Sequence, residues 1–87
     1  VNSYEEANQV IQLLGRNRLT SLMKLGLLSA DIGIKLDCCM ALTNLALNSF
    51  ITEELIELII VKSYNDKSKV RRELSYYLLA VANTAQF

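Results

Sequence analysis

The chain matches itself when it is shifted by 36 residues without a gap, so that residues 19–46 fall on residues 55–82. Four paired positions carry the same residue: Leu19/Leu55, Leu22/Leu58, Leu42/Leu78 and Ala46/Ala82. Further positions agree in type, including Met23/Ile59, Ile34/Val70, Lys35/Arg71, Asp37/Glu73, Cys38/Leu74 and Leu45/Val81. Because self-similarity at a fixed period is typical of repeat architectures, we predict two copies of one unit, with paired leucines in equivalent environments. A chance match between amphipathic helices is the alternative.

Apolar residues recur at helical spacing throughout the chain, proline is absent, and strand-like alternation never persists. This pattern predicts an all-α fold of about five helices. We expect them at about 4–14, 18–29, 33–47, 53–63 and 68–83, with Thr52 as the N-cap of the fourth.

The composition narrows the possible functions of this 87-residue chain. Nine acidic and nine basic residues cancel, so no net charge recruits nucleic acid or an anionic membrane. Histidine is absent, and no metal-ligand spacing, phosphate loop or nucleophile constellation is present. We therefore expect no enzyme activity, no cofactor and no metal. The apolar runs are also far shorter than the roughly 18 residues that a membrane span needs.

The two cysteines, Cys38 and Cys39, are neighbours in an apolar run. Adjacent residues on a helix rarely have the geometry of a disulfide, so we interpret both as small buried hydrophobes. Free thiols favour a reducing compartment, the cytoplasm or the nucleus. We also expect the chain, which begins at Val1, to be a piece of a longer protein.

The segments "SYEEANQVIQLLG", "NRLTSLMKLGLLSAD" and "IGIKLDCCMALTNLAL" resemble the three helices of an armadillo-type repeat, within the armadillo/HEAT family. The motif "ALTNLA" at 41–46 is the most specific part of this resemblance. "ITEELIELIIVKSYND" and "KSKVRRELSYYLLAVANTA" resemble the second and third helices of a next unit, whose first helix is reduced to "NSF". The resemblance implies one α-solenoid segment over 1–87, with repeat one at about 4–47 and repeat two at about 49–83.

In that family the third-helix asparagine, here Asn44, points into a concave groove and hydrogen-bonds the main chain of an extended peptide. An amide suits this role because it offers both a donor and an acceptor. Helical spacing places further candidates on the same face of the helix at 33–47 and on the corresponding face 36 positions later. The predicted partner-binding residues are therefore Asp37, Met40, Asn44, Glu73, Tyr76 and Asn83. Ile34, Cys38, Leu42 and Leu45 form the opposite, apolar stripe. Alternatively, Asn44 is an exposed polar residue or a packing residue between adjacent repeats.

The family pattern is incomplete in this chain. The frequent tryptophan of the family is Met40 in the first unit and Tyr76 in the second, and Ala80 stands where the second asparagine would be. A peptide-binding mode that depends on a ladder of tryptophan and asparagine is therefore not implied by the resemblance.

We expect a non-catalytic scaffold module that binds a protein or peptide partner on a concave helical face. Because fewer than about three repeats are seldom stable alone, further repeats of a larger chain or a homo-oligomer are also expected partners. A compact helical-bundle adaptor or oligomerisation domain is one alternative. The other is a HEAT-like module that binds nucleic acid through Lys67, Lys69, Arg71 and Arg72, although we interpret this run as a solvated helix N-terminus.

Overall fold

The computed structural model describes residues 3–84, with side chains from residue 5 onward. The secondary structure of this part of the chain consists of helices joined by short connections, with no strand, so the all-α prediction is confirmed. The five helices are α1 (Ser3–Leu14), α2 (Arg16–Leu27), α3 (Ile32–Leu47), α4 (Glu53–Asn65) and α5 (Ser68–Thr84). None of these helices combines the length and the apolar character that crossing a bilayer requires.

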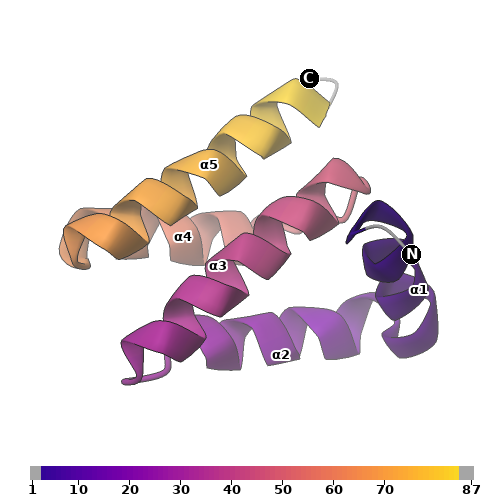
Figure 1. Cartoon of the computed structure of the whole chain (residues 1–87), viewed down its shortest axis with the longest axis horizontal. Helices are drawn as coiled ribbons and strands as arrows, with labels where there is room; N and C mark the ends of the chain where they lie inside the picture. Colours follow the sequence, from indigo (N-terminus) through magenta and orange to yellow (C-terminus); the bar gives the residue numbers. More distant parts are fainter. Residues whose placement is uncertain (1–2, 85–87) are drawn as a thin grey trace.

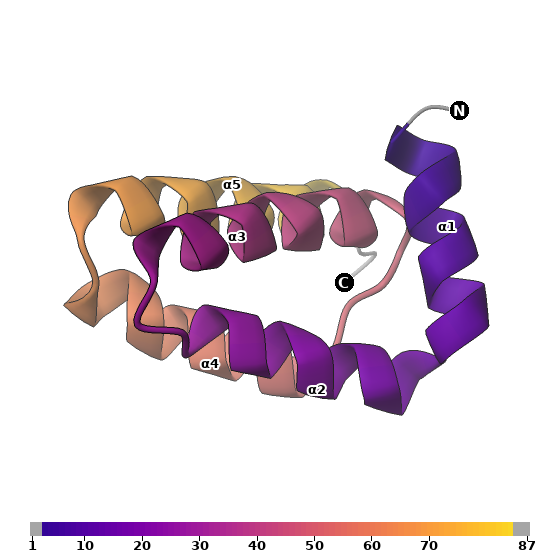
Figure 2. The same ribbon diagram turned by 60° about the horizontal axis from the view of Figure 1, so that its bottom comes forward.

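The helices form two layers. Helices α3 and α5 lie side by side in one layer and run in the same direction, and α2 and α4 lie beneath them in the other (Figures 1 and 2). Each lower helix packs on the upper helix that follows it in the chain, α2 on α3 and α4 on α5. Helix α1 crosses the end of the first pair and contacts both α2 and α3 (Figure 2).

Local chemistry sets the helix boundaries. Gly15 joins α1 to α2 with a positive φ of 78°, a conformation that costs glycine little. Asp31 precedes α3, and its carboxylate accepts hydrogen bonds from two main-chain N–H groups of the first turn at 2.8 and 3.2 Å. Thr52 caps α4 as predicted, because its hydroxyl accepts a hydrogen bond from the N–H of Leu55.

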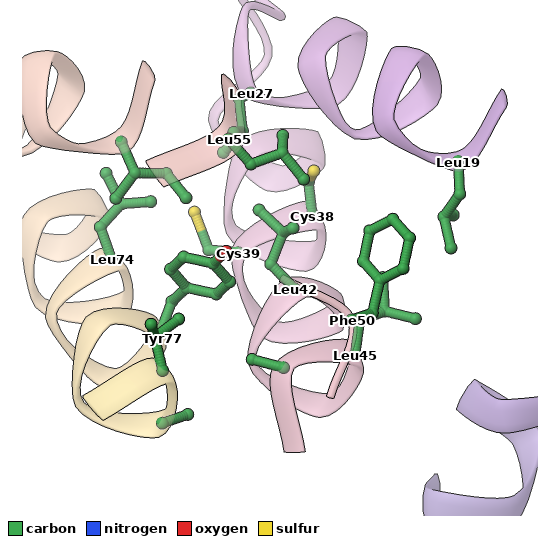
Figure 3. Packing of buried hydrophobic residues seen from close by; sticks show 14 of the residues in the cluster. Leu19, Leu27, Cys38, Cys39, Leu42, Leu45, Phe50, Leu55, Leu74 and Tyr77 are labelled. Carbon is green, nitrogen blue, oxygen red and sulfur yellow. The ribbon is translucent and has the colours of Figure 1, made fainter. Parts of the chain in front are cut away.

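The core lies between the two layers and draws on all five helices (Figure 3). Its largest fully buried side chains are Tyr77, Leu19, Leu27, Leu42, Leu55, Ile59, Leu74, Val70 and Cys39. The packing role expected for both cysteines agrees with this arrangement, since both are buried and free. The Tyr77 hydroxyl is buried without a hydrogen-bond partner among the described residues.

The segment between α3 and α4 contains no helix and contributes Phe50 to the core. The Arg16 guanidinium lies 5.6 Å from the centre of the Phe50 ring and donates a hydrogen bond to the main-chain oxygen of Ile51. This cation–π contact and hydrogen bond fasten the connection to the start of α2. Phe50 was not predicted as a core residue, because helical periodicity gives no information about a side chain in a connection.

Helices α2 and α3 approach closely at Gly26. A methyl group at this position would lie 2.8 Å from the Cys38 sulfur and 3.0 Å from its Cβ, closer than atoms of a packed core tolerate. Glycine is therefore needed at position 26 despite its low helix propensity, because the neighbouring helix occupies the space that a side chain would fill.

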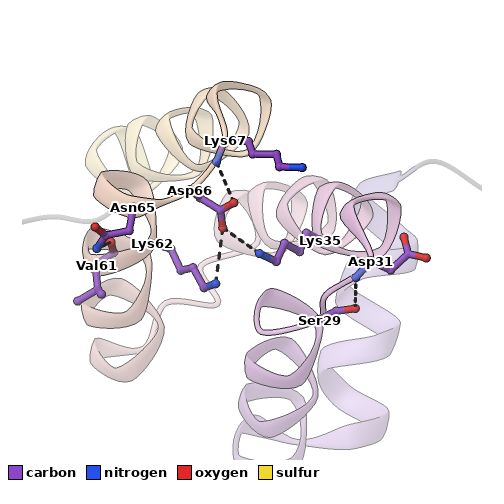
Figure 4. Close-up of polar contacts among 8 residues, drawn as sticks. All are labelled: Ser29, Asp31, Lys35, Val61, Lys62, Asn65, Asp66 and Lys67. Atoms are coloured by element: carbon purple, nitrogen blue, oxygen red, sulfur yellow. Dashed lines mark hydrogen bonds and ion pairs between the residues drawn. The ribbon is translucent and has the colours of Figure 1, made fainter.

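An ion-pair cluster joins the two helix pairs at their turns (Figure 4). Asp66, between α4 and α5, lies 3.1 Å from the Lys35 ammonium on α3 and 3.6 Å from that of Lys62. Its other oxygen accepts the Lys67 main-chain N–H at 2.9 Å. Burial by itself would raise the pKa of Asp66, but the Lys67 N–H and the Lys35 ammonium outweigh it and hold this pKa below its usual value.

The prediction that the paired leucines occupy equivalent environments is wrong, because they are not equally buried. Leu42 is fully buried, whereas its counterpart Leu78 is only half-buried, and Leu22 is more exposed than its counterpart Leu58. The predicted apolar stripe of α3 also departs at Ile34, which is 52% exposed. The differences depend on the side of the helix. On the side where α3 faces α5, residues of the first pair are more buried than their counterparts. On the opposite side, residues of the second pair are more buried.

Candidate partner-binding surface

A hollow of about 270 Å³ lies on the surface that α3 and α5 share. The side chains that line it come from both helices: Met40, Thr43, Asn44, Glu73 and Tyr76. Four of the six predicted partner-binding residues are therefore brought together, although they are up to 36 positions apart in the chain. The two helices run in the same direction (Figure 1), and Met40 and Tyr76, which are paired by the 36-residue shift, line the same hollow.

The other two predicted residues lie outside the hollow. Asp37 is exposed on α3, one helical turn before Met40, and Asn83 is exposed near the end of α5. Ala80, which stands where the second asparagine of the family pattern would be, is buried. The surface therefore has a single asparagine in its lining, as the departures in the sequence suggest.

The hollow exposes apolar and polar groups together. Met40 and Tyr76 are 55% and 50% exposed, which leaves much of two large side chains available for contact. No described side chain hydrogen-bonds the exposed Asn44 amide, although Asn48 donates to the main-chain oxygen of Asn44. The amide is therefore free to pair with an N–H and a C=O of another molecule.

The lining of this hollow contains one carboxylate, that of Glu73, and no basic side chain. Thr43 is not a further free donor, because its hydroxyl already donates to the main-chain oxygen of Cys39. Electrostatically, the hollow suits a partner that presents N–H donors or a cation beside an apolar group.

A second hollow of about 190 Å³ adjoins the first, and Asn44 lines both. It opens between α1, α2 and α3, and is lined by Glu6, Ala7, Val10, Leu19, Met23, Ala41, Asn44 and Leu45. We define these residues as the socket. The socket could not be predicted from the sequence, because the placement of α1 against α3 depends on contacts between distant residues.

A third hollow of about 260 Å³ lies between α2 and α4, and several polar groups of its lining make interactions within the fold. Its Arg16 holds the connection at Ile51, and the Thr20 hydroxyl donates to the main-chain oxygen of Arg16. Its Thr52 caps α4. Because these polar groups already have partners within the protein, we assign this hollow to the fold and not to a ligand.

The remaining candidate groups do not form a site. Burial raises the pKa of Cys38 to about 11 and that of Cys39 to about 12, so neither thiol is poised for reaction. The basic side chains of residues 67–72 are exposed at the start of α5, as expected for a solvated helix terminus.

Comparisons with protein-family models, with curated proteins and with solved structures gave no match to this chain.

Proposed function

We propose that this chain is a non-catalytic interaction module that binds a partner segment across α3 and α5. The observation that carries the proposal is the hollow in which Met40, Asn44, Glu73 and Tyr76 meet. In this mechanism the Asn44 amide pairs with the main chain of the partner, and Met40 and Tyr76 provide contact area. The Glu73 carboxylate orients a donor or a cation.

We also propose that the two helix pairs are successive units of an armadillo/HEAT-like α-solenoid. The 36-residue match and the two-layer arrangement of α2–α3 beside α4–α5 support this assignment. The unequal burial of paired positions departs from the predicted equivalence, and in a short solenoid it would follow from a neighbouring pair being present on only one side of each unit. Val70 is 1% exposed where Ile34 is 52% exposed, as expected for an inner and an outer copy of one position.

The experiment selects peptides from a phage-displayed random library on the full chain, and then measures their affinity by fluorescence anisotropy. Asn44→Ala and Tyr76→Ala are expected to weaken binding by about tenfold each, because each removes a contact at the centre of the surface. Val61→Ala, at an exposed position on α4 in the other layer, is the matched control and should bind as the wild type does.

Circular dichroism of each variant separates a lost contact from a lost fold. Asn44→Ala should keep the wild-type helicity, because the Asn44 side chain makes no hydrogen bond within the described structure. If Asn44→Ala unfolds the chain, the amide is structural. If the selected peptides bind both alanine variants as tightly as the wild type, the α3–α5 surface is not the binding site.

A further inference from the structure

The two ends of the helix stack differ in what they expose. On α3, the side chains that face α5 are covered by it, and Cys39, Leu42 and Ala46 are fully buried. Their counterparts on α5, Ser75, Leu78 and Ala82, are less covered, although Leu78 still packs partly against the core. We define these three residues, together with Leu79, the counterpart of Thr43, as the knob; Leu79 is 59% exposed and Leu78 half-buried.

The lower layer repeats this contrast. Thr20 of α2 is buried, and Lys24 is engaged by Glu54 of α4 at 2.9 Å. Their counterparts on α4 are Ile56, which is half-buried, and Ile60, which is 54% exposed. The α4–α5 end of the stack is thus an apolar face, and it is more apolar in the lower layer than the corresponding face of α2.

The opposite end of the stack carries the socket. Five of its eight lining residues have counterparts in the second unit, and all five counterparts are buried there: Leu55, Ile59, Tyr77, Ala80 and Val81. Within the chain, that corresponding space lies against α3, where Leu42 packs beside Leu55 and Tyr77 (Figure 3). The socket is therefore the position where a side chain equivalent to Leu42, such as Leu78, would insert.

We propose that a second copy of this chain docks its socket end on the α4–α5 end of the first. The contact between the copies would resemble the contact that α2–α3 makes with α4–α5 inside one molecule, except that α1, which has no counterpart in the second pair, forms one wall of the socket. In this arrangement the knob of one copy fills the socket of the next, with Leu78 in the place of Leu42. The occupant follows from the molecule itself, because the same apolar pattern already packs in this way once.

Charge favours the same arrangement. Inside the chain, Lys35 on α3 pairs with Asp66, which lies in the turn of the next helix pair. Arg71 is the counterpart of Lys35 and is exposed on α5. In a docked second copy, Arg71 would face the turn between α2 and α3, where the exposed Asp31 carries the negative charge. The cross-unit ion pair would then be repeated between the copies.

The size of the end face sets the strength of the contact. A helix of 17 residues is about 25 Å long, and two packed layers are about 20 Å deep. Each copy therefore offers about 500 Å², or about 1,000 Å² in total, at the lower limit for a specific interface. The association should be weak and depend on concentration. It is also head-to-tail, so it can continue beyond two copies unless a ring closes.

The experiment is sedimentation equilibrium of the full chain from about 1 µM to about 1 mM. The weight-average mass should rise with concentration from 9.8 kDa to beyond that of two copies. Leu79→Glu changes the knob, and Val10→Glu changes the socket wall on α1 at a residue that is 39% exposed. Each is expected to weaken self-association at least tenfold, because an uncompensated charge would be buried in the contact.

Leu25→Glu is the matched control. Leu25 and its counterpart Val61 are exposed in both units, so the position lies outside the proposed contact, and this variant should associate as the wild type does. Ala82→Arg is a second change of the knob at an exposed position, in case Leu79→Glu disturbs α5. Circular dichroism checks that each variant is folded.

A mixture of Leu79→Glu and Val10→Glu chains is the decisive sample. One variant keeps an intact socket and the other an intact knob, so the mixture should form a complex that stops at two chains. An interface that uses the same patch on both copies could not be restored in this way. The proposal is overturned if the wild type stays monomeric over the whole range, if neither folded knob variant weakens association, or if the mixture does not associate.

Discussion

The first helix pair, α2–α3, and the second, α4–α5, share an apolar pattern but expose different sides of it. Cys39, Leu42 and Ala46 of the first pair are fully buried on the side that faces α5. Val70 and Ala80 of the second pair are buried on the side that faces α3, while their counterparts Ile34 and Asn44 are exposed. The burial of a residue in these two pairs therefore depends on which side of its helix has a neighbouring helix.

The largest expected contrast is between the thiols at one paired position. Cys39 is fully buried and its pKa is raised to about 12, whereas its counterpart Ser75 is exposed. A Ser75→Cys thiol should have an ordinary pKa near 8.5 and react with a disulfide reagent about 10³-fold faster at neutral pH than either native cysteine. Absorbance of the released thiol measures both rates at low protein concentration.

The pH dependence of these rates gives the control. Between about pH 6 and about pH 8 the rate of the Ser75→Cys thiol should rise about tenfold per unit, in proportion to its thiolate. The native cysteines should instead react at the rate of unfolding in this range. Equal rates for the native and introduced thiols would mean that the two helix pairs are not differently covered.

The paired leucines should differ strongly in their effect on stability. Leu42→Ala is expected to reduce the free energy of unfolding by about 2–5 kcal/mol, because it leaves a cavity in the core. Leu78→Ala should cost about 1 kcal/mol, because Leu78 is half-buried and water can reach the vacated space. Urea unfolding followed by circular dichroism measures both values, and similar losses would break the comparison.

The pair Ile34 and Val70 tests the comparison in the opposite direction, since here the second unit is the better covered. Val70→Ala should reduce the free energy of unfolding by about 2 kcal/mol. Ile34→Ala should change it by less than about 0.5 kcal/mol, despite removing a larger side chain. The same unfolding measurement applies. A greater loss at Ile34 would place the outer face of α3 against another element.

The smallest effect is expected at the charged pair Lys35 and Arg71. Lys35→Met removes the closer of the two ammonium partners of Asp66 and should lower the thermal midpoint by several degrees at neutral pH, whereas Arg71→Met should leave it nearly unchanged. The Asp66 pKa is held low in the fold, so its contribution is present above about pH 4 and is lost as the pH falls through the folded pKa.

The loss of stability at acidic pH therefore distinguishes the two substitutions. The wild type and Arg71→Met should lose stability in parallel between about pH 5 and about pH 2, and Lys35→Met should lose less. Lys35 acts in the opposite range. The hydrogen bond to Asp66 raises its pKa, so its contribution is present at neutral pH and is lost as the pH rises through that value. Parallel acid limbs for all three proteins would contradict the cross-unit pair.

Much of the local structure could be predicted from the sequence. Periodicity located all five helices, and the Thr52 cap followed from local chemistry. Spacing also placed Met40 with Asn44, and Glu73 with Tyr76, on common helix faces, as the lining of the hollow requires. Helical spacing is a short-range property, so neighbours in the chain are sufficient to determine it.

The tertiary structure decided which of these faces are covered. The socket, the core position of Phe50 and the exposure of Ile34 all depend on where a segment distant in the chain comes to lie. The sequence by itself determined the helices and their apolar stripes, because those follow from the order of residues. Which side chains of each helix pair are buried depends on the packing of α1, α3 and α5. Burial is a property of contacts between distant residues, so paired positions with similar residues differ in exposure.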